Sequence, residues 1–164
     1  MCGIVGLFIK DKSLEPQLGA LLTDMLVTMT DRGPDSAGIA IYGSESQEAA
    51  KLTVQSDAPD ADFATLGKDL SKVIDAPVTA TVKDTHAVLA MPADKIAEAR
   101  QALPELRPGV KFMSTGETME IYKEVGLPKD VAARFNLSQM SGSHGIGHTR
   151  MATESAVTTL GAPP

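Results

Sequence analysis

The second residue of the chain is its one cysteine, Cys2, which directly follows the initiator Met1. If Met1 is removed, Cys2 carries both a thiol and a free α-amine. Such a residue is close to a complete nucleophilic catalyst, because the thiol attacks and the amine takes up and returns the proton. An α-amine titrates at about pH 8 and a thiol at about pH 8.5, so both work near neutrality. The alternative interpretation is a small buried residue at the start of a strand.

Two further segments place polar residues between apolar stretches. Residues 31–38 contain one cation, two carboxylates and several turn-forming residues. Residues 145–155 contain a short strand pattern that ends at Arg150, whose guanidinium could bind a carboxylate through two parallel hydrogen bonds. Taken alone, the first segment predicts a helix-to-strand connection and the second an ordinary polar strand end.

In this order, the three segments resemble the class II glutamine amidotransferases, whose glutaminase domains are N-terminal-nucleophile hydrolases. The family opens with Cys-Gly-Ile-Val-Gly, as at residues 2–6. It has an Arg-Gly-x-Asp-Ser-x-Gly segment, as at 32–38, and a His-Thr-Arg-x-Ala-Thr segment, as at 148–153. The resemblance covers about residues 2–44 and 143–162.

Two details of these segments indicate a branch of that family. The Gly-Pro-Asp variant at residues 33–35 and the tail at 151–159 are similar to the glutamate-synthase-related branch. More narrowly, they are similar to the amidotransferase-like subunit of N-methylglutamate synthase, in a truncated form.

The resemblance implies roles for individual residues. Cys2 is the nucleophile, and Gly3, which has no side chain, lets the substrate approach the backbone beside the thiol. Arg150 binds the α-carboxylate of glutamine, and Thr153 hydrogen-bonds the same end of the substrate. Glu154 stands where several relatives carry histidine; it either binds the α-ammonium group or is a departure from the pattern.

The segment at residues 31–38 is expected to position this site. Arg32, Gly33 and Asp35 are expected to hold their loop against Cys2, in a structural or a catalytic role. The family's oxyanion hole uses an Asn-Gly pair downstream of the Arg motif. This sequence has one asparagine, Asn136, which precedes that motif and is followed by leucine.

The resemblance therefore implies a glutaminase-type subunit that hydrolyses the glutamine amide and supplies ammonia to a synthase-like partner in a hetero-oligomer. In glutamate-synthase-like systems that partner uses flavin and an iron–sulfur cluster. This chain is expected to bind no cofactor, because it has one cysteine and no dinucleotide fingerprint. The alternative hypothesis is a non-catalytic subunit that binds glutamate or partner subunits, which the missing Asn-Gly pair favours.

The composition of the chain argues against several classes of partner. The net charge of −6 argues against nucleic acid or an anionic membrane surface as a partner. Apolar residues make up 43% of the chain, enough for a core, and no stretch approaches the ~20 apolar residues of a membrane span. A cytoplasmic protein is expected.

Periodicity predicts an α+β fold in three parts. Residues 1–44 and 143–164 form parts of the amidotransferase domain, an incomplete sheet-and-helix core of the N-terminal-nucleophile type. Residues 45–115 show the order β-α-β-β-α-β and predict a ferredoxin-like insertion that offers a docking surface. Residues 116–142 are expected to be a helical connection.

No metal site is expected. His144 and His148 are four residues apart, but the glycines around them argue against a helix, and His86 is distant in sequence. The aspartates at positions 57, 60 and 62 lack the glycine and glutamate spacing of a calcium-binding loop.

Overall fold

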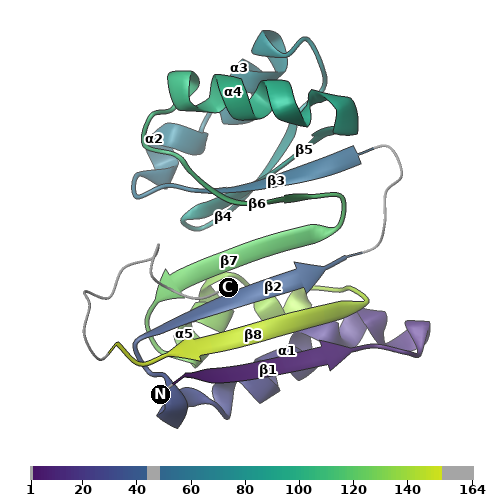
Figure 1. Ribbon diagram of the computed structural model, residues 1–164, viewed down its shortest axis with the longest axis vertical. Coiled ribbons are helices and arrows are strands. Elements are labelled where there is room, and N and C mark those ends of the chain that lie inside the picture. The colour runs from purple at the N-terminus through teal and green to yellow at the C-terminus, as the bar shows by residue number, and fades with distance from the viewer. Residues whose placement is uncertain (1, 44–48, 153–164) are drawn as a thin grey trace. The chain divides into compact units, whose positions relative to one another are not determined.

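The computed structural model describes residues 2–43 and 49–152 (Figure 1). The chain divides into two compact units, Met1–Ser44 with Ile121–Pro164, and Glu45–Glu120. Each unit contains a four-stranded antiparallel sheet, with strand order β1-β8-β2-β7 in the first and β4-β5-β3-β6 in the second (Figure 1). The α+β class expected from the sequence is confirmed.

The first unit packs its helices on one face of its sheet. Helix α1 packs on β1 and β8, and α5 packs on β2 and on α1. β7 begins in the last residues of the second unit and joins this sheet beside β2. The elements are β1 (Gly3–Phe8), α1 (Leu18–Val27), β2 (Ser36–Tyr42), β7 (Met119–Val125), α5 (Pro128–Arg134) and β8 (His144–Arg150), with short 3-10 helices at Lys12–Gln17, Thr30–Arg32 and Leu137–Gln139.

Two glycines allow α1 to lie directly on the central strand β8. A Cβ atom on Gly145 would lie 2.8 Å from Leu22 Cδ2, and one on Gly147 would lie 2.8 Å from Leu26 Cδ1. Leu22 and Leu26 are completely buried, so the strand has no room for a side chain beneath them. The absence of Cβ atoms on this face of β8 therefore sets the distance between helix and sheet.

The opposite face of this sheet, here called the outer face, carries apolar side chains that the described residues leave exposed. Ile4 is 67% exposed, Phe8 65% and Ile146 39%. At one end His144 stacks on Tyr42, with 4.0 Å between the ring centroids. His148 lies on this face between Ile4 and Gly38, and burial lowers its pKa below the usual value of 6.5.

The second unit places its helices on one face of its own sheet. Its core packs apolar side chains of β3 and β5, such as Leu52 and Leu89, against apolar side chains of the helices, such as Leu70 and Leu103. Lys51 on β3 lies opposite Gly116 on β6, so the unit's first and last strands are neighbours. The elements are β3 (Ala49–Gln55), α2 (Pro59–Phe63), α3 (Leu66–Val73), β4 (Thr79–Lys83), β5 (His86–Pro92), a 3-10 helix at Ala93–Lys95, α4 (Ile96–Leu106) and β6 (Lys111–Gly116).

This element order, β-α-β-β-α-β, is the order that the sequence predicts for an insertion. Apolar residues at helical spacing predict one helix over residues 57–74, but the structure breaks it into α2 and α3. Thr65 lies at the break with non-helical angles, φ −124° and ψ 6°. Its hydroxyl donates to Asp69 (2.6 Å) and accepts from Arg107 (2.9 Å), so side-chain hydrogen bonds replace the continuous helix.

The expected helical connection over residues 116–142 is wrong in its first part. Met119–Tyr122, expected as a short helix, belongs to strand β7, because backbone pairing with β2 outweighs its local preference. The expected second helix of this stretch is present as α5. The second unit ends at Glu120 rather than at residue 115.

The first helical region begins differently from what its residue types predict. Ser13 is a plausible N-cap, but the cap is Asp11, whose carboxylate accepts from the Ser13 backbone N–H at 3.0 Å. A 3-10 helix then precedes α1, which begins only at Leu18. Leucine and methionine recur at helical spacing over residues 18–29, which predicts a buried stripe, but Leu21 in that stripe is 40% exposed.

Within the described ranges no helix is long and apolar enough to cross a membrane.

The glycine face of β8 yields a stability prediction. Gly147→Val should lower the free energy of unfolding by about 1–3 kcal/mol, because the new side chain overpacks against Leu26 and Val5. Gly6→Val is the matched control: it lies on the neighbouring strand, and a Cβ there meets nothing within 4 Å. Chemical denaturation measures both. An equal loss in the two variants would contradict the packing argument.

A second prediction concerns pH. The folded protein holds the pKa of His148 below its unfolded value, so the unfolded chain binds more protons as the pH falls. The stability associated with neutral His148 is complete above about pH 6.5 and is lost as the pH falls through the folded pKa. The free energy of unfolding should therefore decline less steeply toward pH 5 in His148→Gln than in the unsubstituted chain. Identical slopes for the two proteins would refute this assignment.

Candidate active site

The sheet of the first unit brings the three sequence segments to one edge. Strand β8 pairs with β1 through Gly3 opposite Thr149, and with β2 through Ser36 opposite Arg150. Continuing the first register by one residue places Cys2 opposite Arg150. Because alternate residues of a strand share a face, Cys2, Arg150 and Ser36 form one row on the outer face.

The turn before β2 is held against the end of β8 through the backbone. A Cβ atom on Gly33 would collide with the backbone of Thr149 and Arg150, so this close approach requires glycine. The Asp35 backbone N–H donates to the Arg150 carbonyl at 3.1 Å. The Asp35 carboxylate accepts from the backbone N–H of Ala152 at 2.7 Å.

Asp35 therefore connects three segments of the chain. Besides its two bonds to the β8 end, its carbonyl accepts from the Gly126 N–H at 2.9 Å. These contacts place Asp35 as a positioning residue for the segment that follows Arg150.

The backbone beside Cys2 is closely packed on its inner side. A Cβ atom on Gly3 would lie 2.9 Å from Thr149 Oγ1 and 3.2 Å from Met29 Cβ. The Thr149 hydroxyl donates to the Met29 carbonyl at 3.3 Å and is completely buried. Cys2 itself is exposed, so the interpretation as a buried residue at a strand start is wrong.

Ser36 and Thr149 belong to this edge, although the sequence assigned neither a role. Ser36 is 1% exposed, and its Oγ has no hydrogen-bond partner among the described residues. A buried hydroxyl without a partner is uncommon, and it can donate to a ligand or a water molecule. Its place inside the Arg32–Gly38 motif was the available signal, but only strand pairing shows that it lies beside Arg150.

The other expected residues are distributed as follows. Arg32 is exposed and ends the 3-10 helix that precedes Gly33. Met1, Thr153 and Glu154 lie outside the described residues.

Asn136 lies in a different region of the first unit. It has a left-handed conformation, φ 56°, at the turn after α5. The 3-10 helix that follows it packs on α1 at Gly19, near the beginning of β8 rather than its end. Asn136 is therefore not placed to serve the edge at Arg150.

This edge combines an exposed thiol with a guanidinium in the same row of the sheet. The thiol can attack an electrophilic carbon, and the guanidinium can bind a carboxylate several bonds away. In the ranges 2–43 and 49–152 no group of three or more His, Cys, Asp or Glu side chains is arranged to hold a metal ion.

Comparison with known proteins gives two similar sequences. The chain is 63% identical over 164 residues to the glutamine amidotransferase-like protein GlxB of Rhizobium meliloti (strain 1021), covering all of this chain and 54% of that protein. It is 29% identical over 177 residues to a putative glutamine amidotransferase of Methanothermobacter thermautotrophicus, covering all of this chain and 56% of that protein.

The chain spans about half the length of the curated relatives it matches. No protein-family model matches it. Both similar proteins carry names of the glutamine amidotransferase type.

Proposed function

We propose that the chain is the glutaminase-type part of an amidotransferase-like protein, with Cys2 as its N-terminal nucleophile once Met1 is removed. The observation that carries this proposal is the row formed by Cys2 and Arg150 at one edge of the first sheet. The similarity to proteins named glutamine amidotransferase-like adds support.

In the proposed reaction the Cys2 thiol attacks the side-chain amide carbon of glutamine. Its own α-amine, directly or through a water molecule, takes the thiol proton and passes it to the departing ammonia. Water then hydrolyses the γ-glutamyl thioester, which releases glutamate and restores the thiol. The sum is glutamine and water giving glutamate and ammonia, with no oxidant or reductant required.

Arg150 would hold the α-carboxylate of the same glutamine. A strand end is a suitable platform for this task, because the backbone of Arg150 is fixed by Ser36 on β2 and by Asp35 in the turn. The missing side chain of Gly3 makes room for Thr149 and Met29 on the inner side of the sheet. Thr153 and Glu154 would follow on the segment that Asp35 orients through Ala152.

We further propose that the ammonia passes to a synthase-like partner of the glutamate-synthase or N-methylglutamate synthase type. The two proteins would form a hetero-oligomer, with flavin and an iron–sulfur cluster bound in the partner. The first unit would then belong to a core of the N-terminal-nucleophile type.

A second candidate function is a non-catalytic subunit that binds glutamate or partner subunits. The position of Asn136 favours it, because this asparagine lies at the turn after α5, away from the Arg150 edge, and is not placed to act there as an oxyanion donor. Loss of one such donor typically lowers the rate by about 100-fold or more.

Replacement of Cys2 distinguishes the two candidates. Cys2→Ala should abolish ammonia release from glutamine while leaving glutamate binding intact, because no other cysteine is present to attack the amide. Ammonia release is measured with a coupled assay, glutamate binding by calorimetry, and removal of Met1 by intact-protein mass spectrometry. A diazo-ketone analogue of glutamine should modify Cys2 alone.

The controls for this experiment follow from the structure. Gly6→Ala, on the same strand but in open space, should retain full ammonia release. Undiminished activity of Cys2→Ala would exclude the mechanism. An unsubstituted chain that binds glutamate, keeps Met1 and releases no ammonia would favour the non-catalytic alternative.

Replacement of Arg150 tests the carboxylate-binding role. Arg150→Lys keeps the charge but loses the two-pronged geometry, so the KM for glutamine should rise with a smaller change in kcat. Arg150→Ala should weaken binding by about 2–5 kcal/mol if the pair is desolvated. Arg100→Ala, in the second unit, is the control and should leave the KM unchanged. Normal glutamine binding in both Arg150 variants would remove this residue from the site.

A further inference from the structure

Strand β4 lies at one edge of the second unit's sheet. The strand order is β4-β5-β3-β6, and β4 pairs with β5 from Thr79 opposite Ala90 to Lys83 opposite His86. Val82 is 52% exposed, and Thr79 and Thr81 are exposed as well. The strand therefore offers a free edge to the surroundings.

The hydrogen-bonding pattern shows which residues point their backbone groups outward. The Ser56 N–H donates to the Thr85 carbonyl at 2.9 Å on the β3 side of β5, so the backbone groups of His86 face β4 instead. Lys83, paired with His86, consequently faces β5. By alternation Ala80 and Val82 direct their N–H and C=O groups away from the sheet.

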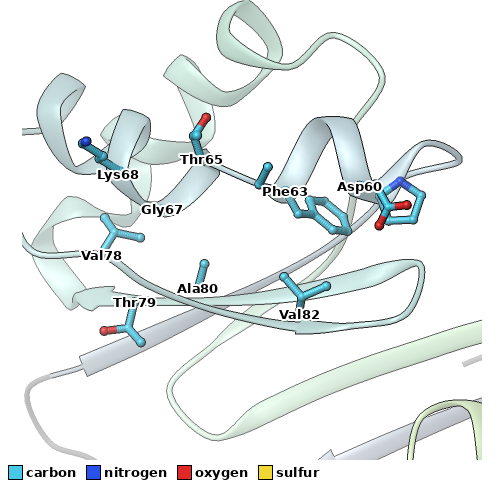
Figure 2. A pocket seen from close by; sticks show the side chains of 11 residues that line it. Asp60, Phe63, Thr65, Gly67, Lys68, Val78, Thr79, Ala80 and Val82 are labelled. Carbon is cyan, nitrogen blue, oxygen red and sulfur yellow. The ribbon is translucent and has the colours of Figure 1, made fainter.

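Between Pro77 and Lys83, this edge carries no residue of the kinds that normally prevent strand addition. Residues 78–82 contain no charge and no proline, and two of the five are valine and two threonine. The edge also borders a groove of about 710 Å³ between β4 and helices α2 and α3 (Figure 2). Val78, Ala80 and Val82 line it from the strand, and Phe63 from α2.

The sequence of the edge is symmetric about Ala80. It reads Val-Thr-Ala-Thr-Val over residues 78–82. If a second copy adds antiparallel about a two-fold axis at Ala80, Val78 faces Val82 of that copy and Thr79 faces its Thr81. Such pairs are favourable across strands, and an interface built from one patch on both subunits is the usual form of a dimer.

We propose that two copies of this chain associate through β4, with a two-fold axis at Ala80, to form one continuous eight-stranded sheet. The outward backbone groups of Ala80 and Val82 then gain the partners that the free edge lacks. The two helix layers lie on the same side of the joined sheet, because even-numbered residues of β4 pair only with even-numbered residues of the second copy.

Charge favours this pairing. Lys68 lies at the Val78 end of the groove and Asp60 at the Val82 end (Figure 2). The antiparallel arrangement turns Lys68 of one copy toward Asp60 of the other. At the strand ends, Lys83 faces Pro77 and Asp84 faces Ala76, so no like charges oppose each other.

The test is sedimentation equilibrium of the unsubstituted chain and of Thr79→Lys/Thr81→Lys. We expect the unsubstituted chain to be dimeric, and the variant to dimerise about tenfold or more weakly, because lysines then oppose lysines at two places. Mixing this variant with Thr79→Glu/Thr81→Glu should restore a heterodimer. The control Gln101→Lys/Gln139→Lys adds the same charge at exposed positions elsewhere and should remain dimeric.

A backbone variant makes the test independent of charge. Ala80→Pro removes only an outward N–H, which an edge strand tolerates, but it blocks pairing at the axis. Circular dichroism and thermal unfolding confirm that each variant is folded. A monomeric unsubstituted chain would overturn the proposal and leave an extended segment of another protein as the occupant. A dimer that persists in the lysine variant and in folded Ala80→Pro would overturn it equally.

Discussion

The packing of α1 on β8 is the constraint on which the first unit depends. Because Gly145 and Gly147 have no side chains, Leu22 and Leu26 reach the backbone of the strand, and the helix covers the centre of the sheet. β8 is paired on both sides, with β1 and with β2. The register of this one strand consequently determines which residues meet at the edge of the sheet.

The candidate site is a consequence of that register. Cys2 precedes β1, Asp35 precedes β2 and Arg150 ends β8, so the third segment, more than a hundred residues beyond the other two, meets them at the same edge. The contacts that hold them are mainly made by the backbone, with Gly33 packed on the strand end and Asp35 bonded to its carbonyl. Such contacts fix the direction of the strand ends while leaving the side chains of Cys2 and Arg150 on the outer face.

The second unit is organised by a different set of interactions. Arg107 donates to the Asp62 carbonyl (3.0 Å), Thr65 Oγ1 (2.9 Å) and the Asp69 carboxylate (2.7 Å), and so joins the end of α4 to the break between α2 and α3. The five N–H donors of a guanidinium lie in one rigid plane and suit this task better than a lysine would. The unit buries one face of its sheet under its own helices, and β4 forms one of the two edges of that sheet.

The sequence alone determined the features that depend on local chemistry and periodicity. Alternating and helical apolar patterns predicted the order of elements in the second unit, and the turn residues around Arg32 to Gly38 predicted the connection into β2. The resemblance carried by the three motifs predicted that Cys2 and Arg150 belong to one site. Local preference was insufficient where partners are distant: Met119–Tyr122 is a strand because β2 pairs with it, and Leu21 is exposed although it fits the apolar stripe.

Only the tertiary structure decided how the parts meet. Strand pairing placed Ser36 beside Arg150 and gave Asp35 its bond to Ala152, contacts that have no signature in the spacing of the residues. The same holds for Asn136, which the sequence shows but whose distance from the site follows from the packing of the turn after α5. Sequence specifies chemistry and local conformation, whereas the neighbours of a strand are selected by the burial of its faces and by the pairing of its backbone groups, and both are properties of the whole sheet.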